Sequence, residues 1–332
     1  MPSPYRVGLL DANRTIGRVP DAPVIIVNPT AGSGRAARLV PWIRERLALR
    51  PDAELHITRH AGDGEERAAR AAEDGHGRLI AVGGDGTVQE VVNGMRSGAA
   101  APSLGIVPVG AGNDLARSLG LPADPAEAWT VAIGRVTRWI DAALATNGEG
   151  RRRWFASAGG IGFDAQVAAA MSTRRGWQSG RAGYLLTTLA QLRRFENRRL
   201  RIVLDGEAFD YRVLLVAIAN GPYYGGGMRI APDAEPDDGW LDLCVVGDIS
   251  RLTAVRQLPN LYRGTHVRHP AVALHRARLI EIDGDGTTFS HLDGEHFGSI
   301  PLRVEIAPSA LEVAAPERRS DRATDLPAPP TR

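Results

Sequence analysis

Three glycines, an aspartate and a threonine stand between an apolar run and a helix-like pattern in the segment LIAVGGDGTVQEVVNG. Gly83, Gly84 and Gly86 would let backbone N–H groups approach a phosphate, and a helix beginning there would add favourable partial charge. Asp85 is suited to meet a metal ion or a phosphate-bound water, and Thr87 to donate its hydroxyl. A tight turn with an aspartate cap would use the same residues. The segment alone therefore does not decide between a phosphate site and a turn.

Two further glycine-bearing loops follow other strand-like runs in the same half of the chain. Their residues are Asn28, Pro29, Gly32, Ser33 and Gly34 in one loop and Gly110, Gly112, Asn113 and Asp114 in the other. Ligands of parallel sheets bind at the carboxyl ends of the strands, so we expect the three loops to converge and form a nucleotide-phosphate site. GDGT recurs at residues 284–287 between two strand-like runs, where the prediction is a hairpin turn.

The elements that must position these loops alternate along the first 120 residues. The predicted strands cover residues 22–29, 54–58, 78–82 and 103–108, and the predicted helices cover residues 35–49, 64–73 and 87–97, with another from Asn113. This alternation predicts βαβ units and a parallel sheet covered on both faces. After about residue 142, β-branched stretches separated by glycine-rich turns predict a mostly antiparallel β-sandwich, with a helical insertion over 166–195.

A chain of 332 residues suits two domains. The predicted organisation is an N-terminal extension (1–20), a nucleotide-binding α/β domain (21–142), a β-rich second domain (143–316) whose end can pack back on the first, and a disordered tail (317–332). No apolar run approaches the ~20 residues of a membrane-spanning helix. Without a secretory signal pattern, the expected location is the cytoplasm.

Composition excludes several kinds of chemistry. All 40 residues of the Lys+Arg count are arginine, because the sequence contains no lysine. P-loop, protein-kinase and pyridoxal-phosphate enzymes each need a lysine and are excluded. The lone Cys244 excludes an internal disulfide and a multi-cysteine zinc site. A net charge of only +2 and the lack of a recognisable reader motif argue against a nucleic-acid partner.

Five segments resemble, in order, the successive motifs of the diacylglycerol kinase catalytic family: VNPTAGSGRA, VGGDGTVQEVVNG, GIVPVGAGNDLARSLGLP, YYGGGMRIAPDAEPDDGWLDLCVV and HLDGE. The resemblance spans about Val24 to Ala315 and implies a two-domain, ATP-dependent lipid kinase. Its substrate would be the hydroxyl of diacylglycerol or of a related lipid such as a sphingoid base or ceramide. One alternative is a NAD kinase-like enzyme, which shares GGDG. Another is a non-catalytic lipid-binding regulatory homologue, because Ala111 stands where the family usually has a nucleotide-contacting threonine.

The resemblance also implies roles for individual residues. The family's ATP site corresponds to Asn28, Thr58, Gly84, Asp85, Gly86, Thr87 and Glu90, to which the loops add Pro29, Gly83, Gly110, Gly112 and Asn113. Asp85, Asp114 and Asp141 correspond to carboxylates that hold the catalytic Mg²⁺ through waters. The proton acceptor lies in the DGE, as either Asp293 or Glu295, so these two and Asp85 are the candidate catalytic residues. Glu235, Asp238 and Trp240 resemble a loop that holds a second metal, although a plain Asp-Gly turn fits equally well.

Arginine is concentrated beside aromatic residues in the middle of the chain. These residues are Arg151, Arg152 and Arg153 with Trp154 and Phe155, then Arg174 and Arg175 with Trp177, and finally Arg193, Arg194, Arg198, Arg199 and Arg201. Such a surface would suit anionic headgroups, although a solvated helix face in a lysine-free chain would look the same. The prediction is peripheral association with the inner face of the membrane, where the lipid substrate lies, and a homodimer is a further option.

Overall fold

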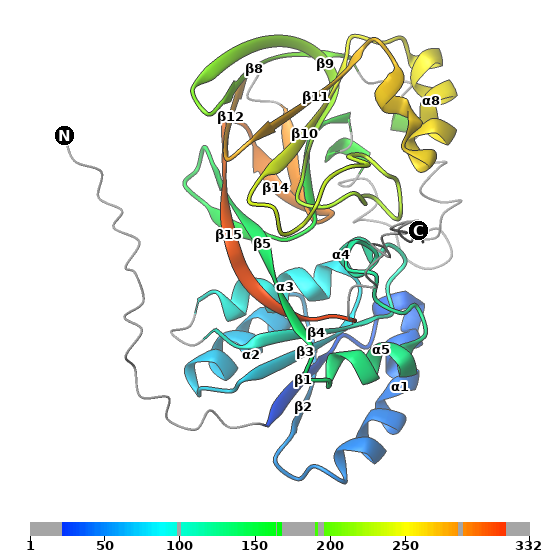
Figure 1. Cartoon of the computed structure of the whole chain (residues 1–332), viewed down its shortest axis with the longest axis vertical. Helices are drawn as coiled ribbons and strands as arrows, with labels where there is room; N and C mark the ends of the chain where they lie inside the picture. The colour runs from blue at the N-terminus through cyan, green and yellow to red at the C-terminus, as the bar shows by residue number, and fades with distance from the viewer. Residues whose placement is uncertain are drawn as a thin grey trace, which may run out of the picture.

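The computed structural model describes residues 22–97, 101–163, 165–167, 190–191, 196–284 and 288–316. The predicted N-terminal extension, the predicted tail and nearly all of the predicted helical insertion lie outside these residues. The described chain forms two domains, with β5 and β15 running from one into the other (Figure 1). No helix among the described residues is long and apolar enough to cross a membrane.

The first domain is a parallel sheet between two layers of helices, as predicted. Its strands are β1 (Pro23–Val27), β2 (Glu54–Ile57), β3 (Arg78–Gly83) and β4 (Ser103–Pro108), in the order β2-β1-β3-β4. Its helices are α1 (Ala31–Leu47), α2 (Asp63–Glu73), α3 (Asp85–Met95), α4 (Asp114–Ser118) and α5 (Pro125–Ala132). β1 is apolar and buried at every position, as a parallel strand covered on both faces must be.

Alternate side chains of β1 enter two separate cores. Val24 and Ile26 pack with residues of α2 and α3, whereas Ile25 and Val27 pack with residues of α1 and α5. α5 was not predicted, although Asp124 gave a signal for it: its Oδ1 caps the helix by accepting from the N–H groups of the second and third residues after it, at 2.9 and 3.0 Å.

The second domain is an antiparallel β-sandwich, which confirms the predicted fold class. Its elements are β5 (Thr137–Asn147), β6 (Arg152–Phe155), β7 (Ala158–Gly162), β8 (Arg198–Leu204), β9 (Glu207–Ala219), β10 (Leu241–Gly247), α8 (Arg251–Arg263), η2 (Thr265–Arg268), β11 (Val272–Ala277), β12 (Leu279–Gly284), β13 (Phe289–Leu292), β14 (Glu295–Ser299) and β15 (Leu302–Ala314). The long strand β9 pairs antiparallel with β7, β8 and β10. A second apolar cluster lies between this part of the sheet and α8.

The last strand joins the two domains into one hydrogen-bonded sheet. β15 pairs antiparallel with β5 along most of its length, and its end pairs parallel with β4 through Val313 and Leu104. Val313 and Leu311 are buried in the core of the first domain beside Ile140 of β5. The first domain and the β-rich second domain are therefore held together by continuous backbone pairing.

The prediction of a hairpin at the second GDGT is wrong. Among the described residues β12 pairs with β8 and β15, whereas β13 pairs with β7 and β14. β12 and β13 therefore belong to different parts of the sheet. Turn residues favour a change of chain direction, but they do not determine which strand lies alongside.

Candidate active site

The first GDGT forms the junction between β3 and α3, with Gly84 capping the helix in an extended conformation. A Cβ at Gly83 would lie 2.2 Å from Thr87 Oγ1, closer than atoms can approach, so only glycine fits there. The free N–H groups of the first turn of α3 begin at this loop. The junction has the construction expected of a phosphate-binding helix N-terminus.

The structure brings the three glycine loops into contact. A Cβ at Gly110 would lie 2.5 Å from Gly84 Cα, and a Cβ at Gly32 would lie 2.1 Å from the carbonyl oxygen of Val109. Arg35 secures the second of these contacts by donating to Val109 O at 2.9 Å. Glycine is needed at these positions because neighbouring backbone fills the space that a side chain would take.

Two carboxylates, of the partly buried Asp85 and the buried Asp114, connect the loops of both domains. Asp85 accepts hydrogen bonds from the N–H groups of Asn113 at 2.7 Å and Asp114 at 2.6 Å. Asp114 accepts from the N–H groups of Gly226 at 2.9 Å and Gly227 at 2.8 Å, in the GGGM segment of the second domain. Burial raises the pKa of Asp85, and burial together with the charge of Asp85 raises the pKa of Asp114 to about 7.

The two acids of the DGE face different surroundings. Asp293 and Gly294, with φ of 47° and 87°, form the tight turn between β13 and β14. Asp293 is partly buried, and its carboxylate accepts from three consecutive backbone N–H groups, of residues 156 to 158, at 3.0 to 3.3 Å. Burial raises its pKa to about 6. Glu295 instead is exposed, and its Oε1 lies 3.1 Å from where a Cβ of Gly86 would be.

A polar cleft of about 1540 Å³ opens between these elements. The predicted site residues that line it are Asn28, Pro29, Thr58, Gly84, Gly86, Thr87, Glu90, Gly110 and Glu295. Four others, Gly83, Asp85, Gly112 and Asn113, do not line the cleft but support the loops that do. Glu90 also holds the start of α2, because its carboxylate accepts from the N–H groups of Gly62 at 2.8 Å and Gly64 at 3.1 Å.

Comparison with known proteins places this geometry in a family. Residues 22–145 match the diacylglycerol kinase catalytic domain, and residues 157–315 match the YegS C-terminal NAD kinase beta sandwich-like domain. The chain is 32% identical to a diacylglycerol kinase of Mycobacterium tuberculosis over 294 residues, which are 88% of this chain and 94% of that protein. The chain belongs to the diacylglycerol kinase family.

Other members of the family agree with this assignment. A diacylglycerol kinase of Staphylococcus saprophyticus is 31% identical over 88% of this chain and 94% of its own length. A crystal structure of a diacylglycerol kinase from Bacillus anthracis superposes with a TM-score of 0.69 at 25% identity, covering 90% of this chain and 97% of that one. Because the family's proteins carry lipid-kinase names, the NAD kinase alternative is not favoured.

Sequence reasoning missed several residues of this lipid kinase's cleft, among them Arg59, His60, Gln89, Arg151, Arg153 and His296. Arg153 on β6 pairs with Glu65 at 3.0 Å and donates to Gln89 at 3.1 Å. Phe155 on the same strand is fully buried. Residues 152–155 form strand β6, so the alternative of a solvated helix face is wrong for them. Arg151 and Arg153 line the cleft, and a membrane surface at these residues stays a prediction.

The remaining arginines of the predicted membrane surface give a mixed result. Arg174, Arg175, Arg193 and Arg194, with Trp177, lie outside the described residues. The last three arginines belong to β8, where every second side chain is buried, so they lie on a strand and not on a helix face.

Asp141 and the predicted second metal loop are held by other contacts. The carboxylate of Asp141 accepts from the N–H groups of Gly239 and Ser309, each at 2.7 Å. Asp238 accepts from the N–H of Trp240 at 3.0 Å and pairs with the guanidinium of Arg276. In the part of the chain that the structure describes, no cluster of three or more acidic, histidine or cysteine side chains is arranged to hold a metal directly.

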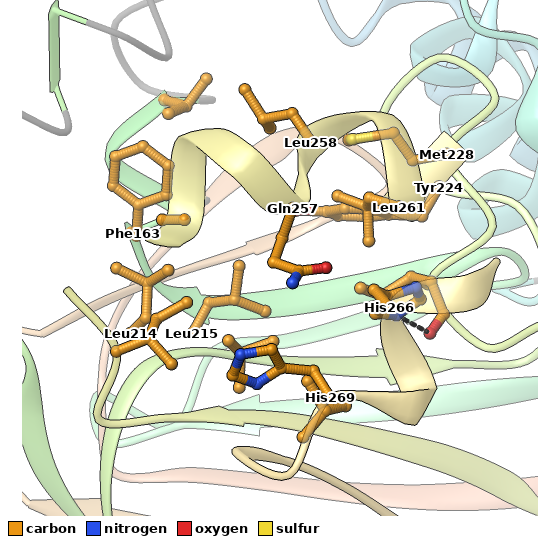
Figure 2. Close-up of a pocket in the computed structure, with 16 residues that line it drawn as sticks. Phe163, Leu214, Leu215, Tyr224, Met228, Gln257, Leu258, Leu261, His266 and His269 are labelled. Atoms are coloured by element: carbon orange, nitrogen blue, oxygen red, sulfur yellow. Dashed lines mark hydrogen bonds between the residues drawn. The ribbon is translucent and has the colours of Figure 1, made fainter. Parts of the chain in front are cut away.

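A second, apolar cavity of about 790 Å³ lies between α8 and strands β9 and β10 (Figure 2). Leu214, Leu215, Leu258 and Leu261 line it from opposite sides. His266 also lines it, and burial lowers its pKa, so that the ring is neutral near pH 7. The almost entirely apolar lining of this pocket suits a hydrocarbon chain.

Proposed function

We propose that this lipid kinase transfers the γ-phosphate of ATP to the hydroxyl of diacylglycerol or a closely related lipid, with Mg²⁺ as the required cation. One observation carries the proposal: Glu295 of the second domain lies against Gly86 of the phosphate-binding loop of the first. A carboxylate and a phosphate-binding loop then share one cleft. That arrangement suits transfer of a phosphoryl group to a hydroxyl that must lose a proton.

Backbone N–H groups at the start of α3 and in the adjoining glycine loops would bind the phosphates of ATP. Arg59, Arg151 and Arg153 line the same cleft and would supply positive charge, since the chain has no lysine for this task. Arginine presents several donors in a fixed geometry that matches phosphate oxygens. The chain's own groups thus neutralise and orient the nucleotide.

The chemistry of Asp85, Asp114 and the neighbouring Asn113 fits a Mg²⁺ ion. Asp85 raises the pKa of both Asp114 and Asp293 through its charge, so the three carboxylates lie near enough to oppose one another's ionisation. Asn113 Oδ1 is buried and accepts no hydrogen bond from the described residues. Mg²⁺ prefers such oxygen donors and retains waters. We assign Asp85 and Asp114 to its site, where the ion would offset negative charge on the transferring phosphate.

Asp141 has a supporting role in this proposal. Its carboxylate accepts from the N–H of Gly239 in the turn before β10 and from the N–H of Ser309 in a bulge of β15, and so holds both segments against β5. No second metal is included, because Asp238 already pairs with the cation of Arg276.

Glu295 is the proposed proton acceptor, and Asp293 is a positioning residue. The three N–H groups that bind Asp293 occupy the carboxylate and fix the hairpin on which Glu295 stands. Phosphoryl transfer is loose, so the hydroxyl proton leaves late and a weakly basic carboxylate is sufficient.

The apolar cavity is the proposed site for an acyl chain. Tyr224 and Met228 line it, and between them Gly226 and Gly227 donate to Asp114 in the active site. One short loop therefore contacts both the proposed cation site and the cavity. A lipid whose chain occupies the cavity would have its polar end near the cleft.

Filling this cavity is expected to discriminate between lipids by chain length. Leu258→Trp should raise KM for a long-chain diacylglycerol about tenfold, because displacing about two methylene groups loses ~0.8 kcal/mol each. A short-chain diacylglycerol should keep its KM. Steady-state assays with both lipids in the same detergent measure the difference, and an equal rise for both would contradict this assignment.

Restoring the family's hydroxyl at Ala111 is expected to strengthen nucleotide binding. Ala111 is exposed beside the cleft-lining Gly110. Ala111→Thr should gain one hydrogen bond of about 0.5–1.5 kcal/mol, which lowers Kd for Mg-ATP by about two- to tenfold. Calorimetry measures the change, and Ala111→Val is the matched control for shape. Equal affinity in both variants would show that the hydroxyl makes no contact.

Transfer of labelled phosphate from Mg-ATP to a panel of lipids in mixed micelles tests the function as a whole. Labelled diacylglycerol, with no product from NAD, is the expected result. Labelled NAD would favour the NAD kinase alternative. Folded protein that binds lipid but neither binds ATP nor transfers phosphate would favour the non-catalytic alternative.

A further inference from the structure

Helix α8 carries apolar side chains on two adjoining faces. Its inner face, with Ala254, Leu258 and Leu261, lines the apolar cavity described above. Leu252, Val255 and Tyr262 are exposed by 58%, 36% and 44%. Residues spaced by three, seven and ten positions share one face of a helix, so these three lie together on an exposed face that adjoins the cavity-lining face.

The cluster is unusual within this protein. Eight large apolar side chains are exposed among the described residues, and three of them lie on this single helix face. Exposed apolar residues that occur singly need no explanation, whereas a contiguous group marks a surface that contacts something. No residue of α8 is buried, so the helix lies over the cavity as a partly exposed cover at the edge of the second domain (Figure 1).

The charge of the helix indicates what it contacts. Arg251, Arg256 and Arg263 are all exposed, and the helix contains no aspartate or glutamate. Arg268 of η2 adds another exposed cation just beyond the end of α8. A helix with exposed apolar residues between arginines is suited to an interface where hydrocarbon and negative headgroups meet.

We propose that the exposed apolar face of α8, formed by Leu252, Val255 and Tyr262, docks onto an anionic phospholipid bilayer, with the helix lying in the plane of the interface. Leu252, Val255 and Tyr262 enter the boundary of the acyl chains, and the arginines contact the headgroups. The adjoining face of the same helix covers the cavity, so docking brings the proposed acyl-chain site to the membrane that contains the lipid. This inference rests on the proposed function in one respect: the lipid-kinase activity explains why the enzyme benefits from docking. The docking itself can be tested without that activity.

Sedimentation with vesicles tests the docking without ATP or turnover. The full chain is expected to bind vesicles of phosphatidylglycerol and phosphatidylcholine more strongly than pure phosphatidylcholine vesicles. The double variant Leu252→Asp with Val255→Asp should lose at least about tenfold in partition coefficient, since it replaces the buried apolar area with charge. Leu49→Asp with Val136→Asp, at exposed apolar positions of the first domain, is the matched control and should bind as the native chain does.

The electrostatic part has its own variants. Arg256→Gln and Arg263→Gln should each lower binding to the anionic vesicles about fivefold, which is ~1 kcal/mol per arginine at the membrane surface. Neither should change binding to neutral vesicles. Added salt should weaken the binding of the native chain to anionic vesicles and bring it toward the binding of the variants.

Three results would overturn the proposal. The α8 variants could bind vesicles as tightly as the matched control. The native chain could fail to bind anionic vesicles at all. Sedimentation equilibrium could show a dimer that the Leu252 and Val255 changes convert to monomer, which would make the face a contact between copies. Phosphorylation of a short-chain lipid dispersed as monomers is measured in parallel, and its absence would count against the proposed function without touching the docking result.

Discussion

Asp85→Asn is expected to lower kcat about a thousandfold or more. The Asp85 carboxylate accepts hydrogen bonds from the backbone N–H groups of Asn113 and Asp114. An asparagine would present an NH₂ group to one of these two donors, so one hydrogen bond would be lost. A buried charged hydrogen bond is worth ~1.5–3 kcal/mol. The change also removes a negative charge from the proposed cation site, and preorganised electrostatic groups typically contribute about 10²–10³ in rate.

The second GDGT of the chain supplies the control for this prediction. Asp285→Asn makes the same chemical change in the same tetrapeptide, at a residue that has no role in the proposed function. It should leave phosphate transfer unchanged. Transfer by Asp85→Asn is compared at saturating Mg-ATP, with thermal melting to verify that the variant is folded. Activity within a few fold of the native chain would exclude Asp85 from both the nucleotide and the cation site.

Glu295→Gln is the second large effect. The amide cannot accept a proton, so kcat should fall about 10²–10⁴-fold, the usual contribution of general base catalysis. The glutamate is exposed in the cleft and has no structural hydrogen bond among the described residues that the change would break. The Kd for Mg-ATP and the melting temperature should therefore stay unchanged.

Asp293→Asn separates the two acids of the DGE. Its carboxylate accepts from three backbone N–H groups, and an asparagine would leave at least one of them facing an NH₂. This buried mismatch should destabilise the protein by about 1–3 kcal/mol and lower its melting temperature. Single-turnover transfer and thermal melting are measured on both variants. A folded Asp293→Asn that has lost transfer, beside an active Glu295→Gln, would reverse the two roles.

Local sequence pattern determined most of the first domain. PVIIV could only be a strand buried on both faces, and glycines after successive strands placed three loops at one edge of a parallel sheet. The order of the five motifs indicated the diacylglycerol kinase family. The absence of lysine excluded P-loop, protein-kinase and pyridoxal-phosphate enzymes. Strand patterns and glycine loops depend on residues only a few positions apart, so they can be recognised in a single sequence.

Contacts between distant parts of the chain were decided only by the tertiary structure. The hydrogen bonds from Gly226 and Gly227 to Asp114 join residues 112 and 113 positions apart, and Asp293 is held by residues about 136 positions away. Which acid of the DGE is tied down, which arginines face the cleft and which strand lies beside β12 all depend on such partners. Spacing and turn chemistry describe one segment at a time. Strand pairing and burial are set by the free energy of packing whole elements together, so the sequence marked the reactive residues and the fold assigned their roles.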